Sequence, residues 1–207
     1  MGDTQRVRTE VDGDVWRVTL DSPGTGNAVD PAMAAALGEA LRTRPPQTRA
    51  VLLLAEGERF CVGGDVRGFA AADDPGASVG RLATDWHEVV RAFLATPVPV
   101  VAGVHGAVAG AGVGLMGACD VVVCARSTRI RPAYAAIGFS PDGGTSWTLA
   151  HALGPARALD LVLANGTLDE HLDDEARLIA ESAADPEGRE GVRAFVEKRR
   201  PAFRAAR

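Results

Sequence analysis

Short apolar runs recur along this chain and alternate with segments that have helical periodicity. The runs at Val51–Leu54 and Val100–Val104 are continuously apolar, which is typical of strands that are covered on both faces. Val15–Leu20 and Val121–Val123 are two further runs rich in β-branched residues and predict two more strands. Strands that alternate with helices predict an α/β fold with a largely parallel sheet.

Helices are predicted where apolar residues recur every three or four positions, or where helix-start signals occur. Asp30-Pro31 resembles an N-cap followed by proline at the first helical position. The small and polar stretch Ala71–Ser78 is expected to be a mobile loop before the next helix. The predicted helices are Pro31–Arg42, Val79–Leu94, Thr145–Leu153, Pro155–Leu163, Asp173–Ala183 and Gly191–Lys198.

The composition is that of an ordinary globular protein: 207 residues, 46% hydrophobic and 24% charged. The net charge of -5 argues against nucleic acid or an anionic membrane as the main partner. The first ten residues have no apolar signal core, and the three cysteines have neither C-x-x-C nor zinc spacing. We therefore expect a cytoplasmic protein without a structural metal.

Two glycine-rich stretches, Phe60–Asp65 and Gly106–Gly114, follow two of the predicted strands. Glycine lets a backbone approach a ligand closely, and two such backbones can direct N–H groups at one developing oxyanion. The alternative interpretation is a pair of tight turns that use glycine for close packing. Gly112–Gly117 also matches G-x-G-x-x-G, but the next strand begins too soon for the crossover helix of a dinucleotide-binding fold.

Asp142 lies in the turn Ser140–Gly144, just before a predicted helix. Such a residue either caps the helix or presents a carboxylate as a general base or nucleophile. His87 lies beside Trp86 on an apolar helical stripe, where an interior histidine is the default interpretation. The chain has no G-x-S-x-G elbow, which disfavours a serine hydrolase.

Several motifs in the right order make the chain resemble the crotonase, or enoyl-CoA hydratase/isomerase, family. The most specific are Arg59–Val66, Pro99–Gly112, Ala118–Asp120 and Ile137–Gly144. The resemblance implies a repeated ββα spiral in residues 1–165, followed by a shortened helical C-terminal region in residues 166–207. It also implies an acyl-CoA substrate, no cofactor apart from that coenzyme A, and a trimer or hexamer weakened by the shortened region.

Carried over by position, the resemblance assigns the oxyanion-hole N–H groups to Gly64 and Ala111. The family's hydratases place two glutamates around a water, and these positions hold Gly114 and Tyr134 here. The carboxylate of Asp142 remains. The substrate-binding residues expected from the resemblance and the glycine loops are Cys61, Gly63, Asp65, Gly110 and Tyr134.

Three functions remain open from the sequence. In the first, the enzyme stabilises a thioester enolate, and Asp142 shuttles a proton so that a double bond moves. In the second, which follows the aryl-CoA dehalogenase branch, Asp142 is the nucleophile, His87 the base, and Tyr134 supports the aryl ring. In the third, the chain binds acyl-CoA without catalysis.

Overall fold

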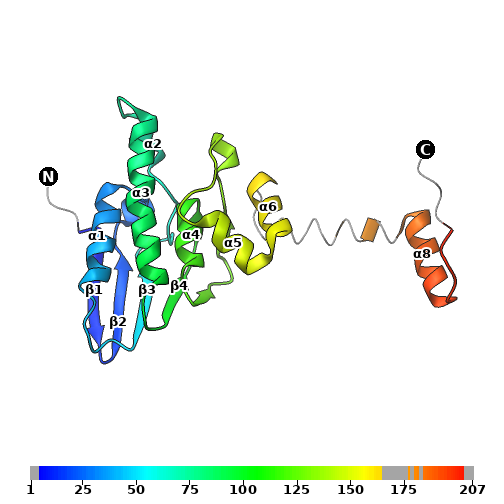
Figure 1. Cartoon of the computed structure of the whole chain (residues 1–207), viewed down its shortest axis with the longest axis horizontal. Coiled ribbons are helices and arrows are strands. Elements are labelled where there is room, and N and C mark those ends of the chain that lie inside the picture. Colours follow the sequence, from blue (N-terminus) through cyan, green and yellow to red (C-terminus); the bar gives the residue numbers. More distant parts are fainter. Residues whose placement is uncertain (1–4, 165–176, 178–179, 182–183, 203–207) are drawn as a thin grey trace. The chain divides into compact units, whose positions relative to one another are not determined.

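The computed structural model describes residues 5–164, 177, 180–181 and 184–202 (Figure 1). The chain divides into two units, Met1–Thr167 and Leu168–Arg207. The first unit is an α/β structure with a largely parallel sheet and helices, which confirms the predicted fold class. The described part of the second unit contains helix α8 (Pro186–Val196).

The main sheet has five strands, and its two edges differ from the sequence expectation. β1 runs antiparallel to β2, whereas all other neighbours are parallel. β1 was not predicted, because Val7 is its single buried residue and its other positions carry a weak apolar signal. β6 was predicted, but all four of its side chains are exposed. In spatial order the strands are β1 (Val7–Asp12), β2 (Val15–Leu20), β3 (Ala50–Ala55), β4 (Val100–Val104) and β6 (Val121–Cys124).

A second, small sheet pairs β5 (Ala107–Ala109) in parallel with β7 (Arg129–Arg131). Cys61 extends it through an isolated parallel bridge to Val108. Strands of the large sheet are therefore followed by short strands of the small one and then by a helix, as in β4, β5 and α4 (Ala111–Gly117). This repeat is the ββα unit that the resemblance implied. Strands of three residues are too short to predict from periodicity.

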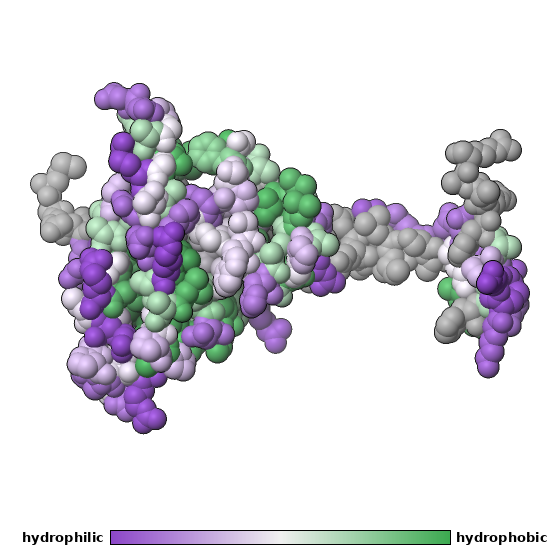
Figure 2. Space-filling model, viewed as in Figure 1, coloured by the Kyte–Doolittle hydropathy of each residue, from purple (hydrophilic) through white to green (hydrophobic). Residues whose placement is uncertain are grey.

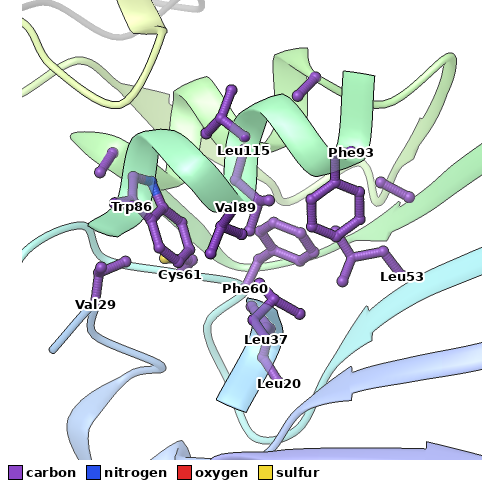
Figure 3. Packing of buried hydrophobic residues seen from close by; sticks show 14 of the residues in the cluster. Leu20, Val29, Leu37, Leu53, Phe60, Cys61, Trp86, Val89, Phe93 and Leu115 are labelled. Atoms are coloured by element: carbon purple, nitrogen blue, oxygen red, sulfur yellow. The ribbon is translucent and has the colours of Figure 1, made fainter. Parts of the chain in front are cut away.

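The core lies between the main sheet and the helices α1 (Pro31–Arg42) and α3 (Pro75–Leu94), as Figure 3 shows. Asp30 caps α1 as predicted, because its Oδ1 accepts a hydrogen bond from the Met33 N–H at 2.7 Å. The predicted apolar stripe of α3 is buried, which fixes the helix against the sheet. Its residues are Leu82, Trp86, Val89, Val90 and Phe93.

Two predicted helix starts are wrong. α3 begins at Pro75 instead of Val79, because the Asp74 carboxylate accepts a hydrogen bond from the Ala77 N–H at 3.0 Å and so caps an earlier turn. The second half of the predicted loop Ala71–Ser78 is therefore helical. α8 likewise begins at Pro186, five residues before the predicted start. Most of the predicted helix at 173–183 lies outside the described residues.

The remaining elements of the first unit are short helices and turns. They are the short helix α2 (Val66–Ala70), the helices α5 (Thr145–Leu153) and α6 (Pro155–Ala164), and the 3₁₀ turns η1 (Pro23–Thr25) and η2 (Ala135–Ile137). Figure 2 shows hydrophobic surface over α6, where Leu159 and Leu163 are exposed. None of the described helices is long and apolar enough to cross a bilayer.

Candidate active site

The two glycine-rich loops pack directly against each other. The Ala109 N–H donates a hydrogen bond to the Cys61 carbonyl at 2.9 Å, which continues the small sheet into the first loop. Gly63 has a φ of +84°, and a Cβ there would lie 2.8 Å from the Ala109 oxygen and 3.2 Å from the Gly110 Cα. Glycine is therefore required at this contact, both for its backbone conformation and for the close approach. The next residue of each loop is a predicted oxyanion donor.

Those two donors, the N–H groups of Gly64 and Ala111, belong to residues that line one cavity. Neither N–H has a hydrogen-bond acceptor within the described part of the chain. Val29 fixes the first loop, because its N–H donates to the Gly63 carbonyl at 2.8 Å and its carbonyl accepts from the Asp65 N–H at 2.9 Å. Ala111 is the first residue of α4, where backbone N–H groups have no partner within the helix. Both N–H groups are therefore unused within the described residues, and both belong to residues that line the cavity.

The cavity has a volume of about 230 Å³, and its walls are mostly apolar. α2 and α3 form one wall, and the segment around η2 forms another. Asp142 and Tyr134 supply the ionisable side chains among its lining residues. The lining residues are Val29, Val62, Gly64, Val66, Phe69, Val79, Leu82, Ala83, Trp86, Gly110, Ala111, Pro132, Ala133, Tyr134, Ala136, Ile137, Phe139 and Asp142.

The carboxylate of Asp142 is held by Tyr134 and does not cap a helix. The Tyr134 hydroxyl donates a hydrogen bond to Asp142 Oδ1 at 2.8 Å. The N-cap position of α5 is Gly144, and no side chain caps that helix. The alternative in which the Asp142 side chain caps α5 is therefore wrong. Burial, followed by the nearby charge of Asp142, raises the pKa of Tyr134 well above its usual value, so the phenol stays protonated and able to donate.

Thr145 connects this pair to the second glycine loop. Its Oγ1 lies 3.1 Å from the Tyr134 hydroxyl and donates a hydrogen bond to the Gly110 carbonyl at 3.3 Å. The Thr145 N–H also donates to the Asp142 carbonyl at 2.9 Å. These hydrogen bonds connect the turn that carries Asp142 to Gly110, the residue before Ala111. They therefore limit the movement of the carboxylate relative to the Ala111 N–H.

His87 contacts the turn that carries Asp142, but it is not among the cavity-lining residues. The Gly143 N–H donates a hydrogen bond to His87 Nε2 at 3.2 Å. Because Nε2 accepts, a neutral ring carries its proton on Nδ1. In this arrangement α3 helps to hold the turn, and the Nε2 lone pair is already used.

The other predicted substrate-binding residues divide into two groups. Gly110 and Tyr134 line the cavity. Cys61, Gly63 and Asp65 are not among the lining residues. Cys61 is fully buried, and burial raises the pKa of its thiol to about 11, so at neutral pH it is an uncharged packing group. The substrate-binding roles assigned to these five residues stay predictions.

Position 114 has no room for a side chain. A Cβ on Gly114 would lie 2.0 Å from the Gly143 carbonyl oxygen and 3.0 Å from the Thr145 nitrogen. α4 and the turn before α5 are therefore in direct backbone contact at this point. A glycine here is required by packing against the turn that presents Asp142.

Sequence reasoning missed much of the cavity wall. Leu82 and Trp86 were interpreted as core residues of the α3 stripe, and Phe69 in α2 was not singled out. An apolar stripe has the same pattern whether it faces a packed core or a cavity. The segment between β7 and α5 had no periodicity at all, and its position over the cavity depends on the fold.

The sequence model of the family described as enoyl-CoA hydratase/isomerase matches residues 10–169. The chain is 36% identical over 157 residues to a protein named probable enoyl-CoA hydratase from Rhodobacter capsulatus, covering 76% of this chain and 60% of that protein. It is 34% identical over 169 residues to the 1,2-epoxyphenylacetyl-CoA isomerase of Escherichia coli, covering 78% of this chain and 63% of that enzyme. The chain thus spans less than two thirds of the length of either relative.

A solved structure described as a putative enoyl-CoA hydratase also matches the chain. A Thermobifida fusca YX protein in complex with acetoacetyl-CoA superposes with a TM-score of 0.72 at 25% sequence identity, covering 88% of this chain and 82% of that chain. The family match includes both glycine loops, Tyr134 and Asp142. The chain belongs to the enoyl-CoA hydratase/isomerase, or crotonase, family.

Proposed function

We propose that this chain binds an acyl-CoA thioester and moves a double bond in its acyl group. The observation that carries the proposal is the cavity that Gly64, Ala111 and Asp142 line together. In the proposed complex, the thioester oxygen accepts hydrogen bonds from the Gly64 and Ala111 N–H groups. Such a pair of donors stabilises an enolate, and each is worth roughly 3–4 kcal/mol in comparable oxyanion holes. The acetoacetyl-CoA bound by the T. fusca relative supports this class of ligand.

Asp142 carries the proton in this proposal. With a 3-enoyl thioester, its carboxylate removes a proton from C2, and the electron pair of the C2–H bond delocalises into a dienolate. The same group then returns the proton to C4, the double bond shifts from C3–C4 to C2–C3, and the carbonyl re-forms. One proton leaves and one proton returns, so no co-reactant is consumed. A single carboxylate is sufficient for this sequence.

Two observations support isomerisation over hydration. Hydration needs one group to activate water and another to protonate carbon, and the resemblance places those glutamates at positions 114 and 134. Gly114 has no space for a side chain, and the Tyr134 hydroxyl is hydrogen-bonded to Asp142. The names of the relatives do not decide between the two reactions, because the R. capsulatus protein is named a probable hydratase and the E. coli enzyme an isomerase of an epoxide.

The dehalogenase alternative has weaker support. It needs His87 to take a proton from water during ester hydrolysis, whereas His87 Nε2 accepts the Gly143 N–H and the residue is not among those that line the cavity. The trio of Asp142, His87 and Tyr134 does lie together, so halide release remains a useful readout.

The decisive experiment compares Asp142→Asn with the 207-residue chain itself. With 3-octenoyl-CoA as substrate, conjugation of the double bond to the thioester is followed by its ultraviolet absorbance. We expect Asp142→Asn to keep its affinity for octanoyl-CoA, measured by calorimetry, and to lose turnover by a factor of about 10² to 10⁴, the usual contribution of a general base. Asp14→Asn, in the exposed β1–β2 turn, is the matched control.

Three outcomes would contradict the proposal. Unchanged turnover in Asp142→Asn would remove the role of this carboxylate. Halide release from a 4-chloroaryl-CoA ester, together with a covalent adduct on Asp142, would favour the dehalogenase. Binding of CoA esters without any product over a broad panel of enoyl-CoA isomers would favour the non-catalytic protein.

A further inference from the structure

Two side-chain hydroxyl groups join the carboxylate of Asp142 to the backbone of the second glycine loop. The Tyr134 hydroxyl donates to Asp142 Oδ1 at 2.8 Å. Thr145 Oγ1 lies 3.1 Å from that hydroxyl and 3.3 Å from the Gly110 carbonyl oxygen. Tyr134 is buried and Thr145 is fully buried, which limits competition from water for these contacts. We call Tyr134 and Thr145 the hydroxyl relay.

The relay ends on the peptide unit that carries one of the two proposed oxyanion donors. The Gly110 carbonyl and the Ala111 nitrogen belong to one planar peptide group, whose electrons are delocalised. A hydrogen bond to the carbonyl oxygen polarises this group and makes its N–H a stronger donor. The Gly110 carbonyl also accepts the Val113 N–H at 2.9 Å, a backbone contact at the start of α4. Thr145 is therefore a second donor on the same oxygen, and it is the one connected to Asp142.

The relay has too few protons to make all of its hydrogen bonds at once, because each hydroxyl has a single proton. While Tyr134 donates to the ionised carboxylate of Asp142, the contact between the two hydroxyls is a hydrogen bond only if Thr145 donates. The Thr145 proton is then shared between the Tyr134 oxygen and the Gly110 carbonyl. A protonated Asp142 is a weaker acceptor than the carboxylate. The Tyr134 proton is then free to turn toward Thr145, which leaves the Thr145 proton to Gly110.

We infer that Thr145 is a positioning residue that links the protonation of Asp142 to the strength of the Ala111 donor. This inference rests on the proposed function. In the proposed reaction the C2 proton moves to Asp142 Oδ2, the oxygen that does not accept the Tyr134 hydroxyl, and the C2–H electron pair moves toward the thioester oxygen. The relay protons only turn about their own oxygens, and no bond to them breaks.

The consequence is a donor that strengthens when it is needed. The Ala111 N–H is polarised most in the step in which the dienolate oxygen carries negative charge. An interaction that is stronger in this step than in the substrate complex raises kcat and leaves ground-state binding nearly unchanged. Thr145 should therefore matter for turnover more than for affinity.

Thr145→Val tests the relay in the 207-residue chain, because it removes the hydroxyl and keeps the branched Cβ. Cooperative strengthening of about 10–30%, applied to a donor worth about 10² to 10³ in rate, predicts that kcat with 3-octenoyl-CoA falls roughly two- to eightfold. The Kd for octanoyl-CoA, measured by calorimetry, should stay nearly unchanged, because this ester has no double bond to move. Thr145→Ser keeps the hydroxyl and should recover most of the loss.

Acetoacetyl-CoA, the ligand of the T. fusca structure, gives a readout that does not need turnover. Loss of its C2 proton to Asp142 gives a bound enolate, which absorbs in the ultraviolet where the keto form does not. In Thr145→Val the ratio of enolate to keto form on saturated protein should fall by the same factor, roughly two- to eightfold. A merely structural role for Thr145 would lower the unfolding free energy and leave this ratio unchanged.

Thr148→Val is the matched control. Thr148 is a second buried threonine of α5, and its hydroxyl donates to the carbonyls of Gly144 at 3.1 Å and Thr145 at 3.3 Å. It is not among the cavity-lining residues. The same substitution there removes a buried hydroxyl without touching the relay, so kcat and the enolate ratio should stay nearly unchanged. Circular dichroism is compared for all variants, and Thr145→Ala carries the same predictions should the valine variant fail to fold.

The outcomes separate the relay from the function. An unchanged enolate ratio in the variant without the hydroxyl overturns the relay and leaves the proposed function standing. The same holds for an equal loss in Thr145→Ser or in Thr148→Val, and for a loss of octanoyl-CoA affinity as large as the loss in kcat. Absence of both turnover and an enolate signal in the unchanged chain contradicts the proposed function and the relay together.

Discussion

The Tyr134 hydroxyl donates a hydrogen bond to Asp142 Oδ1 over 2.8 Å, and this contact brings the segment around η2 onto the turn before α5. The phenol is one of the polar groups on an otherwise apolar wall. Its partner is the carboxylate to which we assign proton transfer. In the proposed reaction Tyr134 therefore acts through the orientation of Asp142, and its side chain also lines the cavity.

Tyr134→Phe removes this hydrogen bond and keeps the ring. We expect kcat to fall about tenfold, equivalent to about 1.4 kcal/mol, with little change in KM because the apolar walls remain. The unfolding free energy should fall by about 1–3 kcal/mol, since the hydroxyl binds a charged acceptor. Steady-state kinetics and urea unfolding measure both. An unchanged kcat would mean that Asp142 does not need Tyr134 for its orientation.

His87→Phe leaves the Gly143 N–H without its acceptor. We expect the unfolding free energy to fall by about 1–3 kcal/mol and kcat to fall no more than about tenfold, because the turn loosens but no proton carrier is lost. A general base would cost about 10² to 10⁴ in rate. His151→Phe is the matched control, because that exposed ring stacks on Trp147 and should leave both quantities nearly unchanged. A loss in the larger range would restore His87 as the base.

Gly114→Ala should destabilise the protein strongly, because its Cβ would lie 2.0 Å from the Gly143 carbonyl oxygen. Overpacking of this kind typically costs about 1–3 kcal/mol, and the forced shift acts on the turn that carries Asp142, so activity should fall as well. Gly80→Ala in α3 is the control: nothing lies within 4 Å of its Cβ position, and alanine should stabilise the helix by about 0.5–1 kcal/mol. Thermal unfolding distinguishes the two, and equal melting temperatures would contradict the packing argument.

Alkaline pH should destabilise the protein in part through Cys61. Burial raises the pKa of this thiol from 9.0 to about 11. Between these values the unfolded chain loses the thiol proton while the folded chain keeps it, so stability is full below pH 9 and falls as pH rises toward 11. The two-unit difference corresponds to about 2–3 kcal/mol.

Urea unfolding at pH 8 and pH 11 measures this loss. Cys61→Ala should lower stability at pH 8 and then show a smaller further decrease at pH 11 than the unchanged chain. Cys124→Ala is the control, because this thiol is exposed and should contribute far less to the pH dependence. An identical pH dependence in the unchanged chain and Cys61→Ala would refute the contribution of Cys61.

Elements with strong local signals were predictable. The valine-rich strand β4, the apolar stripe of α3 and the Asp30 cap of α1 are all present, because each depends on periodicity or on contacts within a few residues. Elements with weak local signals were not. β1 buries Val7 alone, and β5 and β7 have three residues each, so their formation depends on partners elsewhere in the chain.

The sequence by itself determined the family, the two glycine loops and the presence of one carboxylate at Asp142, because glycine, proline and charge patterns are local properties of the chain. The tertiary structure decided which of these residues meet. It placed Tyr134 on Asp142, used His87 Nε2 to hold Gly143, and left no space beside Gly114. These outcomes depend on distances between segments that are far apart in the sequence, and such distances are set by the packing of the sheet and helices around one core.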